Sequence, residues 1–245
     1  MIEPSTKCWA MLAAGLTALI TVGCSGDKVT TKSSAELPRY QVRTIALVPF
    51  TSIRTPQARD RGDLYFSTPQ SVRGSEMSYS IPSNVEPPPH QTVIVPGYAA
   101  EKVTQLFWKR LQSREGVEVL PPGESTKTLS TDEKLAGATP ERAAATVAKR
   151  LKADAALIGL VSVYQERVGG RFGASPPASV GFEVRAVAAD GQVLWVGNYY
   201  ERQRPMTEDL LGFLQRWGMF VTAEELARFG VDEMMKQFPF GAGGE

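Results

Sequence analysis

The feature that most constrains this chain is an uncharged apolar run over residues 9–22, close to the amino terminus. The run is shorter than the about 20 apolar residues that a membrane-spanning helix needs. It follows Lys7 and ends at the small residue Gly23. A positive end, a short apolar stretch and a small residue after it form the pattern of a secretory targeting segment. The sequence therefore predicts an exported chain whose folded part begins after this segment.

The end of the run is more specific. Thr21-Val22-Gly23-Cys24 resembles the lipobox of bacterial lipoprotein signal peptides, although Thr21 stands where that motif usually has Leu. The resemblance implies removal of residues 1–23 as a signal peptide and attachment of a lipid to Cys24. Ser25 in the next position implies sorting to the outer membrane. An ordinary secretory signal cut nearby and an uncleaved anchor are the alternatives.

The cysteine count agrees with this interpretation. The chain has two cysteines, Cys8 and Cys24. Cleavage removes Cys8 and the lipid occupies Cys24, so no thiol is left for a disulfide, a metal ion or a nucleophile. The formal net charge of +1 gives the chain no general attraction to nucleic acid. We therefore expect a fold held by packing alone and no nucleic-acid partner.

Two segments lack regular periodicity. Residues 24–42 are rich in Ser, Thr and Lys and predict a flexible tether that, fully extended, reaches roughly 55 Å. Residues 51–96 are rich in Pro and Ser and predict a long insertion after the first strand. Its aromatic residues are candidate contacts for a partner: Tyr65, Phe66 and Tyr79.

The rest of residues 43–240 predicts one α/β domain. Apolar patterns predict strands at 44–50, 117–120, 155–168, 178–187 and 193–201. Helical patterns lie between Gly97 and Gly116, after an N-cap at Thr139, over 208–217 after a cap at Thr207, and from Thr222 to about 237. This order predicts a single mixed β-sheet with helices packed on it. Residues 241–245 are glycine-rich and are expected to fray.

A family resemblance follows from these elements. Residues 44–50, Thr-Ile-Ala-Leu-Val-Pro-Phe, look like the opening strand of a fold with several known members. These members are the amino-terminal domain of TolB, the curli-secretion lipoprotein, the Pel-polysaccharide lipoprotein and the penicillin-binding-protein activators. Residues 152–159 and the hairpin at 190–195 are similar to later parts of that fold. The resemblance implies a non-catalytic envelope lipoprotein, and it leaves the specific role open because one fold hosts several functions.

The residues offer little for catalysis. The one histidine, His90, lies beside three consecutive prolines and predicts a solvated loop residue. Without a second histidine or a free thiol, Ser-His, Cys-His and zinc sites lose their usual groups. Glu224 and Glu225 fit the first turn of a helix, where carboxylates complement the helix dipole. We therefore predict no catalytic residues, no cofactor and no metal site.

Aromatic and apolar residues near the carboxyl end allow two interpretations. The aromatic group Trp195, Tyr199, Tyr200, Phe213, Trp217 and Phe220 is favoured as core packing under the terminal helices. Alternatively, Leu210, Leu211, Leu214 and Trp217 form an apolar face that meets a neighbouring subunit or the membrane surface. Phe172, at the tip of a glycine-rich hairpin over 169–173, is a further candidate contact.

Together these features predict a lipid-anchored protein on the periplasmic face of the outer membrane. The leading hypothesis is a scaffold or accessory of an envelope assembly or export machine, with a protein partner and with a homo-oligomer as one option. The alternative is a regulator that activates a peptidoglycan synthase and uses a long tether to cross the periplasm. A hydrolase that uses carboxylates is a distant third.

Overall fold

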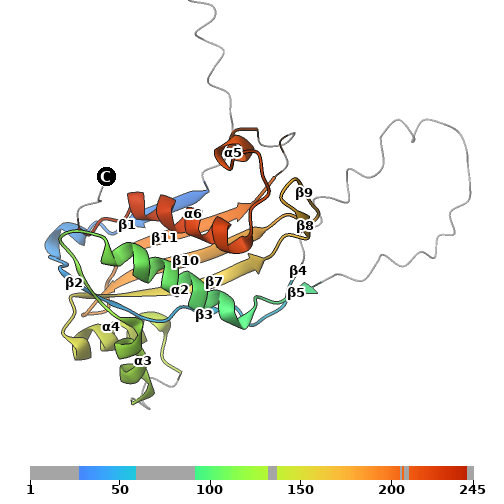
Figure 1. The fold of residues 1–245 in the computed structure, drawn as a ribbon. Coiled ribbons are helices and arrows are strands. Elements are labelled where there is room, and N and C mark those ends of the chain that lie inside the picture. Colours follow the sequence, from blue (N-terminus) through green and yellow to red (C-terminus); the bar gives the residue numbers. More distant parts are fainter. Residues whose placement is uncertain (1–27, 59–91, 132–136, 205, 207–209, 242–245) are drawn as a thin grey trace, which may run out of the picture.

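A twisted β-sheet forms the centre of the computed structural model, which describes residues 28–58, 92–131, 137–204, 206 and 210–241 (Figure 1). The strand order in the sheet is β1-β11-β10-β7-β2-β6, and β3 also pairs with β7. The strands are β1 (Val29–Ser33), β2 (Thr44–Leu47), β3 (Thr51–Ser52), β6 (Glu118–Leu120), β7 (Ala155–Gln165), β10 (Ser179–Ala188) and β11 (Val193–Arg202).

The directions of these strands make the sheet mixed. Strand β2 runs parallel to β6 and β7, whereas β7, β10, β11 and β1 form an antiparallel series. The turn between β10 and β11 contains Asp190, whose carboxylate accepts the Gln192 N–H at 2.9 Å, and Gly191 at φ 102°. Such a turn favours glycine because L side chains rarely adopt positive φ. The predicted single mixed sheet is confirmed.

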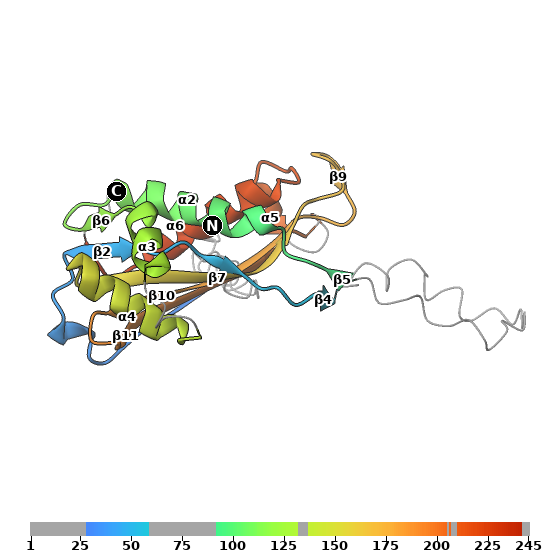
Figure 2. The same cartoon turned by 90° about the horizontal axis from the view of Figure 1, so that it is seen from below.

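Helices cover the two faces of the sheet unequally. The helices α2 (Gly97–Gln112) and α6 (Ala223–Lys236) lie on one face, and α4 (Pro140–Leu151) lies on the other (Figure 2). The core under α2 and α6 contains a line of rings, with centroid distances of 5.2 Å for Phe50–Phe107, 5.8 Å for Phe107–Phe182 and 5.1 Å for Phe182–Tyr199. Small residues such as Ala148 and Ala156 fill the core under α4, which lets this helix lie close to the sheet.

The predicted helix starts at Thr139 and Thr222 are confirmed, as is the strand predicted at 178–187. Thr139 accepts the Arg142 N–H at the start of α4, with Pro140 in the first helical turn. Thr222 and Glu225 form a capping box at the start of α6. Four alternate side chains of β10 are buried: Val180, Phe182, Val184 and Ala186.

The predicted flexible tether is wrong for residues 28–42. Strand β1 pairs with β11 in antiparallel register, from Val29 opposite Tyr199 to Ser33 opposite Trp195, and a short 3-10 helix follows at Leu37–Arg39. The tether was inferred from polar composition, but an edge strand borders solvent and accepts polar and charged side chains, while Val29 packs against the core. The ordered domain therefore begins by Lys28, rather than at residue 43.

The irregular insertion predicted at residues 51–96 is shorter than expected, because regular structure extends into it from both ends. Residues 51–52 form β3 beside β7, and β4 (Gln57–Ala58) pairs with β5 (Thr92–Val93). Residues 59–91 lie outside the described part of the chain. The ordered chain likewise extends past 240, because the Gly241 carbonyl accepts a hydrogen bond from Arg114 at 3.2 Å.

One helix was not predicted. Pro121 and Pro122 end β6, as expected, but Pro122 is also the first residue of α3 (Pro122–Ser130). Proline is favoured in that place because its fixed φ suits the first helical turn and its missing N–H has no intrahelical partner there. Within the described residues, no helix combines the length and the apolar character needed to cross a membrane.

Candidate functional site

The short helix α5 (Leu210–Gln215) exposes apolar side chains to solvent. Leu210 and Leu214 are 53% and 58% exposed, and they share one face because they are four residues apart. On the opposite face Gly212 is buried, and Phe213 packs against Phe220 with ring centroids 5.7 Å apart. An outward apolar face on a helix that already has an inner packed face is typical of an interaction surface.

Trp217 extends this apolar face past the end of α5. It is 88% exposed and has a left-handed backbone conformation, φ 57°. Its N–H donates to the Leu214 carbonyl at 2.9 Å, and the Gly218 N–H donates to the Phe213 carbonyl at 3.0 Å. These two bonds form a Schellman motif, in which glycine is the usual residue at the position that Trp217 occupies. A bulky residue there is unfavourable for the backbone and gains little from burial, which indicates a role in contact.

A buried ion pair holds α5 on the domain. The guanidinium of Arg216 pairs with Glu201 on β11, and the two side chains are only 5% and 3% exposed. Arg216 also donates to the Gly212 carbonyl at 2.7 Å and lies over the Phe229 ring, 5.3 Å from its centroid. Burial lowers the pKa of Arg216, and the nearby Tyr199 opposes that shift. The pair therefore fixes α5 to the sheet at the cost of dehydrating two charges.

Two further groups join this buried pair, and Gln203 lies close to Glu201 in the sequence. Lys28 Nζ lies 3.1 Å from Glu201 Oε1, and the Tyr199 hydroxyl lies 2.8 Å from Glu201 Oε2. Gln203 fixes the loop after α5, because its side chain donates to the Met219 carbonyl at 2.6 Å and accepts the Val221 N–H at 2.8 Å. The start of β1, the end of β11 and α5 thus meet around one carboxylate.

The hairpin of β8 (Gly169–Gly170) and β9 (Gly173–Ala174) lies at the same end of the sheet as α5 (Figures 1 and 2). Phe172 at its tip is 88% exposed. The Arg171 carbonyl accepts the Phe220 N–H at 2.7 Å, so the hairpin is tied to the segment after α5. We call Phe172, Leu210, Leu214 and Trp217 the apolar end of the domain.

A small hollow lies between the hairpin, α5 and α6. Its volume is about 220 Å³, below the range of roughly 300–1,000 Å³ usual for small-molecule sites. The lining residues are Arg171, Arg216, Trp217, Met219, Phe220, Val221, Glu225 and Phe229. This size and its apolar surroundings favour contact with a surface over capture of a metabolite.

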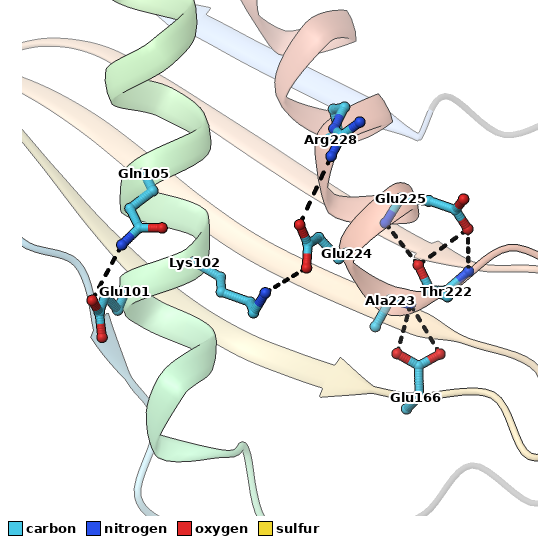
Figure 3. Close-up of polar contacts among 9 residues, drawn as sticks. All are labelled: Glu101, Lys102, Gln105, Glu166, Thr222, Ala223, Glu224, Glu225 and Arg228. Atoms are coloured by element: carbon cyan, nitrogen blue, oxygen red, sulfur yellow. Dashed lines mark hydrogen bonds and ion pairs between the residues drawn. The ribbon is translucent and has the colours of Figure 1, made fainter.

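The carboxylates near the start of α6 have structural partners (Figure 3). Both oxygens of Glu166 accept the Ala223 N–H, at 3.2 and 3.1 Å. Glu224 pairs with Lys102 on α2 at 2.5 Å, which lowers the pKa of Glu224. The Thr222 N–H bond lowers the pKa of Glu225. The predicted dipole-complementing role of Glu224 and Glu225 is confirmed, because both lie in the first turn of α6.

The described residues contain no group of three or more His, Cys, Asp or Glu side chains that could hold a metal ion. His90 and the candidate contacts Tyr65, Phe66 and Tyr79 lie outside the described residues, as do Cys24 and Thr207. The structure brings Phe172 to the same end as Leu210, Leu214 and Trp217, and exposes all four. Their contact with a partner stays a prediction.

The aromatic group that was favoured as core divides in two. Trp195, Tyr199 and Phe220 are buried, as that interpretation requires, whereas Trp217 and Tyr200 are exposed. The ion pair of Glu201 and Arg216 was missed. No periodicity signals it, because its partners are 15 positions apart and meet only through the fold.

Comparisons with known proteins give only distant likenesses. No protein-family model matches the sequence, and no curated protein matches it. The chain is similar to a PelC dodecamer from Paraburkholderia phytofirmans, with 13% identity over 84% of this chain and 93% of that chain and a TM-score of 0.41. It is also similar to lipoprotein GNA1162 from Neisseria meningitidis, with 16% identity over 71% of this chain and 92% of that chain and a TM-score of 0.34. A third similar structure is the LpoB C-terminal domain from Salmonella enterica, with 10% identity over 67% of this chain and 85% of that chain and a TM-score of 0.32. Fold and site together define a small α/β protein with one exposed apolar end.

Replacing Trp217 tests whether the fold needs it. We expect Trp217→Gly to leave the free energy of unfolding unchanged or to raise it by up to about 1 kcal/mol, because glycine removes the left-handed penalty. Leu214→Gly, inside α5, should instead lower it by about 1 kcal/mol. Urea unfolding followed by circular dichroism measures both. A clear loss of stability in Trp217→Gly would show that Trp217 packs on the domain.

Proposed function

We propose that this chain is a lipid-anchored, non-catalytic accessory or scaffold protein of a bacterial envelope assembly or export machine, on the periplasmic face of the outer membrane. The observation that carries this proposal is the short distance between the lipidation motif and the ordered domain. Strand β1 begins at Val29, five positions after Cys24. A domain attached so closely works at the membrane surface.

The same observation weighs against a synthase regulator that reaches across the periplasm. That alternative depended on a flexible tether over residues 24–42, whereas residues 29–33 form β1 and residues 37–39 form a short 3-10 helix. The proposal that the protein is not an enzyme is supported by the partners of the carboxylates at α6 and by the residue content of the mature chain. The long segment at 59–91 supplies candidate contacts for a protein partner in Tyr65, Phe66 and Tyr79.

Lipidation is tested by changing each cysteine separately. We expect the wild-type protein to carry the mass of attached lipid and to stay with membranes after an alkaline carbonate wash. Cys24→Ser should lose both properties, because serine cannot form the thioether. Cys8→Ser is the matched control and should keep both, since Cys8 lies in the segment that is removed. A wild-type protein without lipid would disprove the anchor.

The native mass of the chain from residue 25 onward tests the scaffold role. A discrete large oligomer in buffer without detergent would support a ring or collar in an export machine. A monomer would favour an accessory that binds one partner molecule at a time. Native mass spectrometry and light scattering measure this directly.

A further inference from the structure

The amino-terminal chain joins the domain at the apolar end. Lys28 is the first described residue, and its carbonyl accepts the Tyr200 N–H at 3.1 Å. Its ammonium group lies 3.1 Å from Glu201 Oε1, the same oxygen that pairs with Arg216 after α5. The point where the chain enters the sheet and the base of α5 are therefore both fixed to one carboxylate.

The length of chain before Lys28 limits how far this end can lie from an anchored cysteine. Four Cα–Cα steps separate Cys24 from Lys28, and each spans at most about 3.6 Å, so the total is about 14 Å or less. That distance is about twice the depth of the headgroup region of one leaflet, which is roughly 5–7.5 Å for a bilayer about 40–45 Å thick around a core of about 30 Å. The Glu201 end of the sheet cannot turn far from the membrane.

The side chains exposed at this end suit a lipid interface. Leu210, Leu214 and Trp217 point outward from α5 and its C-terminal turn, and Phe172 points outward from the hairpin that is bonded to the segment after α5. Tryptophan is enriched where hydrocarbon meets water, and exposed Phe and Leu on an amphipathic element enter that layer. Trp217 has a left-handed backbone conformation, which is unfavourable for a bulky residue. A contact made outside the isolated domain would explain a tryptophan at this position.

We propose that the apolar end rests in the interfacial layer of the bilayer beside the lipid anchor, as a second membrane contact that orients the domain. The molecules that contact this surface are phospholipids. This inference rests on the proposed function, because the anchor at Cys24 brings the surface to the membrane. The anchor makes the second contact intramolecular, so even a weak apolar surface remains engaged.

The test uses the one cysteine of the mature chain. Residues 24–245 are coupled through the Cys24 thiol to a maleimide lipid in vesicles of phosphatidylethanolamine and phosphatidylglycerol. Iodide quenching of tryptophan emission is then compared for wild type and Trp217→Gly, free and coupled. The difference between the two proteins isolates Trp217 from Trp108 and Trp195, of which Trp195 is fully buried. We expect coupling to reduce iodide quenching of Trp217 several-fold and to shift its emission to the blue.

Two outcomes would overturn the inference. Equal quenching of Trp217 in free and coupled protein would mean that the apolar end faces water. Protection of Trp217 in the free protein, together with an oligomeric native mass, would mean that a second copy covers it. A Leu210→Ser, Leu214→Ser variant should regain much of the quenching after coupling, which excludes crowding on the vesicle as the cause.

This experiment is independent of lipidation in the cell, because the linkage is chemical. If the cellular protein carries no lipid, the proposed function fails whatever the vesicles show. If it carries lipid but Trp217 stays open to iodide, only the second membrane contact fails.

Discussion

Glu201→Gln is expected to lower the free energy of unfolding by about 3–5 kcal/mol, the largest effect of any conservative change at this end of the domain. Glutamine keeps the shape of the side chain and an oxygen for the Tyr199 hydroxyl, which lies 2.8 Å from Glu201 Oε2. It removes the counter-charge of Arg216, whose side chain is only 5% exposed. Urea unfolding of the mature chain measures the loss.

A matched control separates burial from charge. Asp232 on α6 also pairs with an arginine, Arg110 on α2, at 3.2 Å, but the two side chains are 45% and 48% exposed. Because water screens such a pair, Asp232→Asn should cost no more than about 1 kcal/mol. Equal losses in the two variants would contradict the assignment of Glu201 and Arg216 as a dehydrated pair.

A double substitution tests the origin of the loss. Replacing both members, Glu201→Leu with Arg216→Met, removes the uncompensated charge and should be less harmful than Glu201→Gln alone. Such a result would show that the pair positions α5 rather than supplying net stability. Trp217 directly follows Arg216. Glu201→Gln should therefore loosen the geometry of the apolar end, although none of its four apolar residues is substituted.

Gly230→Ala is expected to lower the free energy of unfolding by about 2 kcal/mol, although alanine is the better helix former by about 1 kcal/mol. Gly230 lies in α6 directly over the Tyr199 ring, and an added Cβ would penetrate that ring. The ring cannot move aside, because its hydroxyl is bonded to Glu201 and it packs on Phe182 with centroids 5.1 Å apart. Overpacking therefore outweighs helix propensity.

Gly123→Ala in α3 is the comparison for Gly230→Ala. An added Cβ at Gly123 meets no atom within 4 Å, so propensity acts alone and the variant should gain up to about 1 kcal/mol. Thermal and urea unfolding of the two variants should thus change in opposite directions. A gain in both would mean that α6 can shift away from the sheet at no cost.

The sequence by itself predicted most of the regular elements. The apolar pattern at 178–187 predicted strand β10, in which Val180, Phe182 and Val184 are buried. Thr139 and Thr222 predicted two helix starts to the residue, because capping depends on side chains within one turn. These features are local, so neighbouring residues carry the information.

The elements that the sequence did not predict depend instead on contacts between distant parts of the chain. Residues 29–33 are too polar to predict a strand alone, and β1 exists because β11 offers an open edge. Helix α3 was not predicted, because it begins at a proline just after β6, where proline also ends a strand. Its Leu129 packs against the core under α4.

For the candidate site, the sequence offered an apolar face of Leu210, Leu211, Leu214 and Trp217 as the alternative to core packing, and it predicted Phe172 at a hairpin tip. Only the tertiary structure decided that this face points outward, that the two features lie at one end, and that the amino-terminal chain enters there. The physical reason is that periodicity shows which side chains lie together on an element but not what covers them. What covers a face depends on long-range packing, here on Arg216 reaching Glu201 and on Lys28 reaching the same carboxylate.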